Sequence, residues 1–249
     1  MKASLDVRET KVFISGDSWG CGEWNPDRED QENLILHKGL EKYFNDMGYS
    51  VINSCRGGIA NNYSIELLAE QLASNYSEGD VVFWIQTDAI RDTRPYDTLT
   101  AQILEANGLF NLCNQLLVKN YQTLDNLAQQ YQTTIYVIGG KHDIYMDGVA
   151  EFAHLNAIAP SWSHLLVGEK YPELFPHATY TDWVVGAIDL DSYPKQFAMQ
   201  VVDEMYQFEQ CYKMYQEPIF NPDGFHPNRE GHLVMFKFLC EKLNLTIDR

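Results

Sequence analysis

The sequence is short of positive charge: 18 lysines and arginines stand against 35 aspartates and glutamates, giving a formal net charge of −17 at pH 7. This surplus of negative charge opposes contact with nucleic-acid phosphates and with anionic membrane surfaces. We therefore expect no nucleic-acid partner and no membrane partner, and a substrate that is neutral or cationic.

The sequence also lacks long apolar runs and paired cysteines. Its apolar runs are far too short to span a membrane, and the N-terminal stretch MKASLDVRETK lacks the apolar segment of a signal peptide. The cysteines occur singly with no CxxC pair, which argues against a disulfide framework and a thiolate metal site. They are Cys21, Cys55, Cys113, Cys211 and Cys240. We expect no metal and no cofactor, and a location that is cytoplasmic, or virion-associated if the protein is viral.

What is present suits a large folded domain, since 45% of the 249 residues are hydrophobic and 13% are aromatic. Short apolar runs alternate with amphipathic stretches, which predicts strands alternating with helices. The expected strands are 12–15, 49–53, 80–86 and 133–139, and the expected helices are 34–47, 62–73, 99–131, 196–215 and 230–243. The run DVVFWIQ (80–86) has no polar alternation, as is typical of a strand buried on both faces. The pattern predicts an α/β fold with a three-layer, doubly wound parallel sheet.

The stretch from Tyr145 to Tyr193 departs from this rhythm, with weak periodicity and several prolines and tryptophans. We interpret it as a lid-like insertion within a single domain spanning residues 1–249, with one short strand at 183–188. We expect it to gate the site or shape the substrate pocket.

Two short motifs at opposite ends of the chain suggest a chemistry. Near the N-terminus, the predicted strand 12–15 ends in Gly16-Asp17-Ser18, within VFISGDSWGCGEW. Near the C-terminus, FNPDGFHPNREGH places Asp223 and His226 three residues apart on one loop. An aspartate can orient an imidazole that takes the proton of a serine hydroxyl, so Ser18, His226 and Asp223 are candidates for a catalytic triad. The alternative for each is a turn residue or a helix cap.

These motifs resemble the SGNH/GDSL family of esterases and lipases. Gly16-Asp17-Ser18 matches its first block, and Asp223-Gly224-Phe225-His226-Pro227 matches its DxxH block. The run VINSCRGGIANN resembles the second block, which implies that the backbone N–H of Gly58 helps to bind the oxyanion. The resemblance implies a flavodoxin-like sheet and an ester-hydrolysing Ser–His–Asp triad.

The third block departs from the family pattern. The family places an asparagine after the third strand to donate a hydrogen bond to the oxyanion, whereas WIQTDAIRD places Asp88 there. An ionised carboxylate cannot donate, and removing one such donor elsewhere costs roughly 10²–10³ in rate. Three alternatives remain open: Asp88 is protonated, another side chain donates, or the chain keeps the fold without the activity. The other donors considered are Gln86, Thr87, Asn61 and Asn62.

The expected function is hydrolysis of a carboxylic ester, for example an O-acetyl group on a carbohydrate. The alternatives are an inactive binding or structural module, which could be of viral origin, and an acyltransferase of the same fold. We expect His142, at the end of a predicted strand, to contact substrate at most, and His232 to pack against or cap the last helix. The tryptophans near the motifs are expected to pack in the core or lid, and they are Trp19, Trp24, Trp162 and Trp183.

Overall fold

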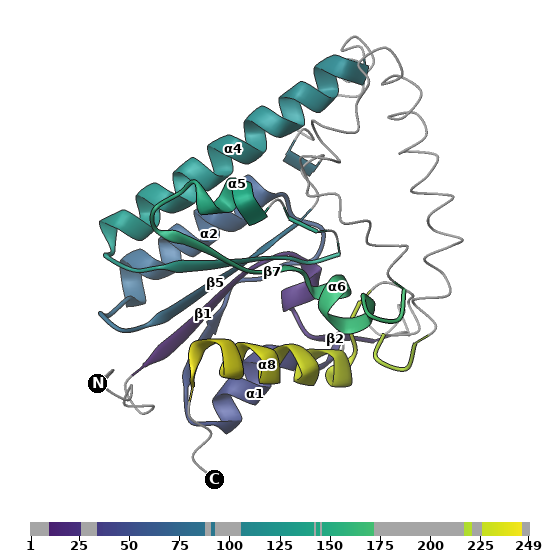
Figure 1. The fold of residues 1–249 in the computed structure, drawn as a ribbon. Helices are drawn as coiled ribbons and strands as arrows, with labels where there is room; N and C mark the ends of the chain where they lie inside the picture. The colour runs from purple at the N-terminus through teal and green to yellow at the C-terminus, as the bar shows by residue number, and fades with distance from the viewer. Residues whose placement is uncertain are drawn as a thin grey trace.

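The fold is built on a five-stranded parallel sheet (Figure 1). The computed structural model describes residues 10–25, 34–87, 91–92, 106–141, 143–144, 146–171, 217–220 and 226–245, with the backbone alone at 106–111, 113 and 114. Across the sheet the order is β4 (Ser50–Asn53), β1 (Lys11–Gly16), β5 (Val81–Gln86), β6 (Ile135–Gly139) and β7 (Leu155–Ser161).

Every pairing in this sheet is parallel. Counted along the chain, the strands stand in the order second, first, third, fourth and fifth, which is the flavodoxin-like doubly wound order. The winding direction changes between β1 and β5, and ligands of such sheets bind beyond the carboxyl ends of the strands at that point. The predicted fold class is confirmed.

Helices cover both faces of the sheet and complete three layers (Figure 1). One face carries α2 (Asn61–Asn75), α4 (Ala106–Gln130) and the short α5 (Met146–Ala150). The other face carries α1 (Gly39–Asp46) and α8 (Arg229–Leu243), joined near the carboxyl edge by α6 (Trp162–Val167). Among the described residues, no helix has the length and apolar character that a membrane crossing requires.

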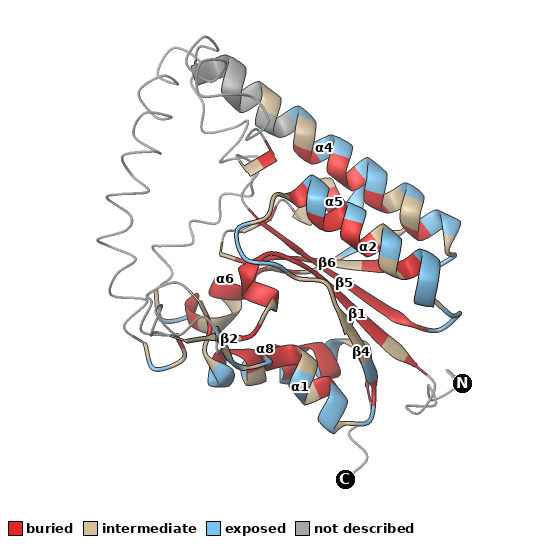
Figure 2. Ribbon diagram, turned by 180° about the vertical axis from the view of Figure 1, so that it is seen from behind, coloured by how far each residue is buried: buried red, intermediate tan, exposed pale blue. Residues whose placement is uncertain are grey.

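The sheet separates two hydrophobic cores because successive side chains of a strand point to opposite faces. Phe13 of β1 and Trp84 of β5 pack with α2 and α4, whereas Ile14 and Phe83 pack with α1 and α8. All six residues of β5 are buried, which confirms the prediction made from its unbroken apolar run. Burial follows the strands and the inner sides of the helices (Figure 2).

The predicted helix 34–47 is wrong in its first turn. Residues Ile35–His37 form strand β3, which pairs antiparallel with β2 (Glu23–Trp24), and α1 begins only at Gly39. Gly39 has a φ of +52°, and a Cβ at this position would lie 2.3 Å from Nδ1 of His232. Only glycine tolerates both conditions, so the helix cannot extend back through this residue.

Residues 146–171, expected to belong to a lid-like insertion, are instead part of the central fold. This part forms α5, β7 and α6, and β7 is the edge strand of the central sheet, paired with β6. The sequence LNAIAPS of β7 concealed the strand because Pro160 has no N–H to donate, a residue that sheets accept at their edges. The rest of the expected insertion, including its short strand, lies outside the described residues, as do the N-terminal end of the expected helix 99–131 and all of helix 196–215.

Candidate active site

The turn that carries Ser18 follows directly from the end of β1. Gly16 has a φ of +150°, and a Cβ there would lie 2.5 Å from the carbonyl oxygen of Ile85 on the neighbouring strand. Asp17 then caps the short 3₁₀ helix Ser18–Gly20, since its Oδ1 accepts the N–H of Trp19 at 3.0 Å. The glycine lets β1 turn close to β5, and the cap places Ser18 at the carboxyl edge where the winding changes direction.

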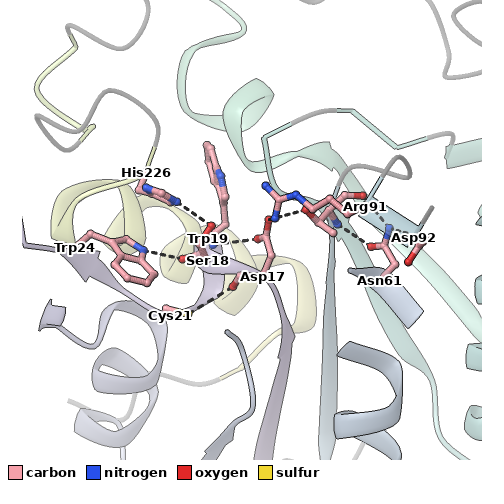
Figure 3. Close-up of polar contacts among 10 residues, drawn as sticks. Asp17, Ser18, Trp19, Cys21, Trp24, Asn61, Arg91, Asp92 and His226 are labelled. Carbon is pink, nitrogen blue, oxygen red and sulfur yellow. Dashed lines mark hydrogen bonds and ion pairs between the residues drawn. The ribbon is translucent and has the colours of Figure 1, made fainter. Parts of the chain in front are cut away.

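His226 meets Ser18 from the other end of the chain. Its Nε2 lies 2.8 Å from Oγ of Ser18, although 208 residues separate the two (Figure 3). Pro227 pairs with Phe220 in an isolated bridge, and Oδ1 of Asn228 accepts the N–H groups of Glu230 and Gly231 to cap α8. The cap and the bridge fix the backbone at Pro227 and Asn228, directly after the imidazole. Asp223, the expected third partner, lies outside the described residues.

Asp17 is the centre of a buried network that the sequence did not reveal. Its Oδ2 accepts the hydroxyl of Thr87 at 2.7 Å and Nη1 of Arg91 at 3.1 Å. Thr87 directly follows β5 and Arg91 comes four residues later, so the network ties the chain after β5 to the turn that carries Ser18. The sequence contains no motif that pairs Arg91 with Asp17. Opposite charge is the one feature that the two residues share as partners, and charge does not single out a partner 74 residues away.

Asn61, at the start of α2, is fully buried and all of its polar atoms are engaged. Its Nδ2 donates to the carbonyl oxygen of Thr87 at 3.0 Å and to Oδ2 of Asp92 at 3.0 Å, and its Oδ1 accepts the N–H of Thr87 at 2.8 Å. The side-chain donors of Asn61 and Thr87 and the backbone N–H of Thr87 already have protein acceptors in this structure. That either residue supplies the oxyanion donor stays a prediction.

Asp92 holds this second cluster together. It accepts the backbone N–H of Asn62 at 2.9 Å and Nδ2 of Asn120 at 2.9 Å, besides Nδ2 of Asn61. Burial raises the pKa of Asp92, and the hydrogen bonds from these asparagines oppose the rise. The carboxylate joins α2, α4 and the loop after β5, which is a structural role.

The loop after β4 carries Gly58 on an exposed stretch beside the Ser18 turn. The N–H of Arg56 donates to the carbonyl oxygen of Gly16 at 3.1 Å, and Nδ2 of Asn53 donates to that of Gly20 at 2.9 Å. These bonds fix the loop against the turn on both sides of Ser18. The role of the Gly58 N–H as an oxyanion donor stays a prediction.

A thiol next to the turn does not compete with Ser18 as a nucleophile. Burial, with a smaller effect of the Asp17 charge, raises the pKa of Cys21 to about 12. The thiol therefore stays protonated at neutral pH, and a protonated thiol is a poor nucleophile.

Two further expected site residues, Asp88 and His142, lie outside the described residues. Within the part of the chain that the structure does describe, no group of three or more histidine, cysteine, aspartate or glutamate side chains could hold a metal ion. His232, in the first turn of the last helix α8, is fully buried against Trp162 of α6, with ring centroids 4.8 Å apart, which confirms the expected packing role.

No protein-family model matches the sequence, and no curated protein matches it either. Solved structures similar to this chain include an acetylxylan esterase, Axe2, from Geobacillus stearothermophilus, in a catalytic mutant form (14% identity, 100% of this chain and 99% of that chain, TM-score 0.44). Another is a member of the lipolytic G-D-S-L family from Veillonella parvula, with 14% identity over 95% of this chain and 100% of that chain and a TM-score of 0.39. A third is the YxiM protein of Bacillus subtilis (11%, 96% of this chain, TM-score 0.45), of which this chain spans 57%. At these values the similarity concerns the fold, and it does not extend to activity or substrate.

Proposed function

We propose that the protein hydrolyses a carboxylic ester with Ser18 as the nucleophile. The observation that carries this proposal is the 2.8 Å contact between Nε2 of His226 and Oγ of Ser18 at the carboxyl edge of the sheet. A serine hydroxyl is a weak nucleophile until an adjacent base accepts its proton, and the contact has the required length.

In the first half of the reaction, Oγ of Ser18 attacks the ester carbonyl carbon while Nε2 of His226 takes the hydroxyl proton. The carbonyl electrons move to oxygen, and the N–H groups of Ser18 and Gly58 stabilise that oxyanion. Collapse of the intermediate breaks the bond to the alcohol, which receives the proton from His226. Asp223 is assigned to the other ring nitrogen, where it holds the imidazole tautomer.

In the second half, water attacks the acyl group on Ser18 and His226 again accepts a proton. The acid leaves and Oγ regains its hydrogen. The substrate proposed is an ester of a small molecule or a carbohydrate, such as an O-acetyl group. A neutral sugar ester suits a chain whose net charge is −17, because no anionic group has to approach it.

A fluorophosphonate probe followed by intact-mass measurement tests this function. The protein should gain one adduct, and Ser18→Ala should gain none. An adduct that persists in Ser18→Ala would overturn the assignment of the nucleophile. If the wild-type chain gains no adduct and cleaves none of a broad panel of acetyl and longer-chain esters, the fold serves as a binding module instead.

A further inference from the structure

The indole of Trp24 contacts both members of the Ser18–His226 pair. Its Nε1 donates to the carbonyl oxygen of Ser18 at 3.0 Å, and its ring centroid lies 5.5 Å from that of His226 at an interplanar angle of 39° (Figure 3). The hydrogen bond acts on the backbone of the nucleophile and the ring acts on the base.

The short strand that carries Trp24 is tied to the C-terminal part of the site. Oε2 of Glu23 accepts Nε of Arg229 at 2.7 Å, and Arg229 opens α8 three residues after His226. The ring also lies close to the loop after β4, since a Cβ at Gly57 would be 3.0 Å from the indole. Trp24 therefore packs against both the loop that carries Gly57 and the imidazole of His226.

This arrangement answers a need of the proposed chemistry. His226 sits on a loop, and an imidazole on a loop can turn about its χ angles unless its ring is packed. Productive proton transfer needs Nε2 to stay within hydrogen-bond reach of Oγ of Ser18, and a misplacement of about 1 Å can cost roughly 10²-fold in rate. When His226 holds the proton, its positive charge also lies within the roughly 6 Å over which an indole attracts a cation.

We infer that Trp24 is a positioning residue: it fixes the carbonyl of Ser18 and holds His226 in the orientation that faces Oγ. The inference rests on the proposed ester hydrolysis, and it assigns to β2 a part in the site that neither sequence motif contains. Trp24 acts through these two residues rather than on the substrate.

Two substitutions separate the ring from the hydrogen bond. Trp24→Leu removes both, and it should lower kcat by about 100-fold while KM changes by less than about twofold. Trp24→Phe keeps an aromatic ring and removes only the N–H, so kcat should fall by about 3- to 10-fold, the usual effect of one hydrogen bond. The recovery by phenylalanine is the result that a merely structural role would not give.

Tyr131→Leu is the matched control. Tyr131 is a half-buried aromatic residue after α4, at the amino edge of the sheet, with its ring centroid 5.3 Å from that of Tyr76. It should cost stability but leave both kcat and KM unchanged. Equal rates for the wild type and Trp24→Leu, or a loss that appears entirely in KM, would overturn the inference. If Trp24→Leu fails to fold, the kcat of Trp24→Phe decides, and an unchanged value would contradict the role of the N–H.

A second measurement does not need turnover. In crystals of Trp24→Leu, the imidazole of His226 should leave hydrogen-bond reach of Oγ of Ser18, whereas in Trp24→Phe it should remain there. An unmoved imidazole in Trp24→Leu would overturn the positioning role even if the enzyme proves inactive. The two proposals can also be told apart. If the wild-type protein does not react with the fluorophosphonate but the imidazole is displaced in Trp24→Leu, the positioning role is supported and the ester hydrolysis is rejected.

Discussion

Two polar clusters lie at the carboxyl edge of the same sheet, and they differ in how their hydrogen bonds are used (Figure 3). Around Asp92, every amide donor of the buried Asn61 already has an acceptor. Around Ser18, the hydroxyl has an imidazole as its partner, and that imidazole comes from the far end of the chain. The first cluster joins α2 and α4 to the loop after β5, and the second places a nucleophile against a base.

In this molecule, burial and complete hydrogen bonding distinguish a structural cluster better than residue type does. A buried polar group without a partner costs about 1–3 kcal/mol, and the buried asparagines avoid that cost by bonding to the Asp92 carboxylate and, for Asn61, to the Thr87 backbone. The hydroxyl of Ser18 has a partner too, but its bond to the imidazole is one that proton transfer can use. Substitutions in the Ser18 cluster should therefore lower activity, whereas substitutions in the Asp92 cluster should lower stability.

The largest expected effect is on the Ser18 cluster. If the proposed hydrolysis holds, His226→Ala removes the proton acceptor, and kcat should fall by a factor on the order of 10⁴–10⁶, as it does in serine hydrolases that lose the base. The melting temperature should change little. His154→Ala is the matched control, because its Nδ1 contacts Oδ1 of Asp125 just ahead of β7, at the opposite edge of the sheet. A similar loss of kcat in both variants would show that the contact with Ser18 is not the cause.

The Asp92 cluster should respond in stability. Asp92→Ala leaves Nδ2 of Asn61, Nδ2 of Asn120 and the N–H of Asn62 without this acceptor. We expect the free energy of unfolding in urea to fall by about 2–4 kcal/mol. The control is Asp46→Ala, which removes an exposed carboxylate paired with Lys42 on α1 and should cost under about 0.5 kcal/mol. Equal stabilities of the two variants would contradict the structural role of Asp92.

Asp88 sharpens the comparison because it sits in the chain between the two clusters. The sequence places it where the family has an asparagine donor, and Asp88→Asn would restore a neutral donor of nearly the same shape. We predict that ester hydrolysis at pH 7 rises by about ten- to several-hundred-fold. The check is kcat/KM on an acetyl ester, with Asp147→Asn, an exchange of the same chemistry in the first turn of α5, as the control. An unchanged rate would mean that another group binds the oxyanion.

The smallest expected effect concerns pH and the buried His232. Burial lowers its pKa to about 3, and the Gly22 backbone opposes part of that shift. Neither ring nitrogen has a described partner within hydrogen-bond geometry. The unfolded chain binds a proton at this residue near pH 6.5, while the folded chain stays neutral until about pH 3. The contribution of His232 to the free energy of unfolding is thus fully present above about pH 6.5. It is lost as the pH falls from there toward 3, by at most about 1.4 kcal/mol per pH unit.

His232→Leu should remove that contribution. Urea unfolding of the wild type and of this variant at pH 5 and pH 7 measures it, and the stability difference between the two pH values should be smaller in the variant. Parallel losses in both proteins would assign the acid sensitivity to other groups.

Much of the fold follows from local sequence. The unbroken run of β5 and the helical spacing of α2 and α8 predicted those elements to within a few residues, because hydrophobic periodicity is a local consequence of which face is buried. Strand β7 was missed since its sequence, with Pro160, has no such period and its place at the sheet edge is set by β6.

The site divides in the same way. The sequence by itself determined that Ser18 ends a strand in a glycine turn and that His226 precedes the last helix, because turn and cap chemistry is local. Only the tertiary structure decided that Asn61 and Thr87 are saturated and that Trp24 lies against both Ser18 and His226. Whether a polar group is free for chemistry depends on partners many residues away, brought near by the packing of whole elements, and no local pattern encodes their distance.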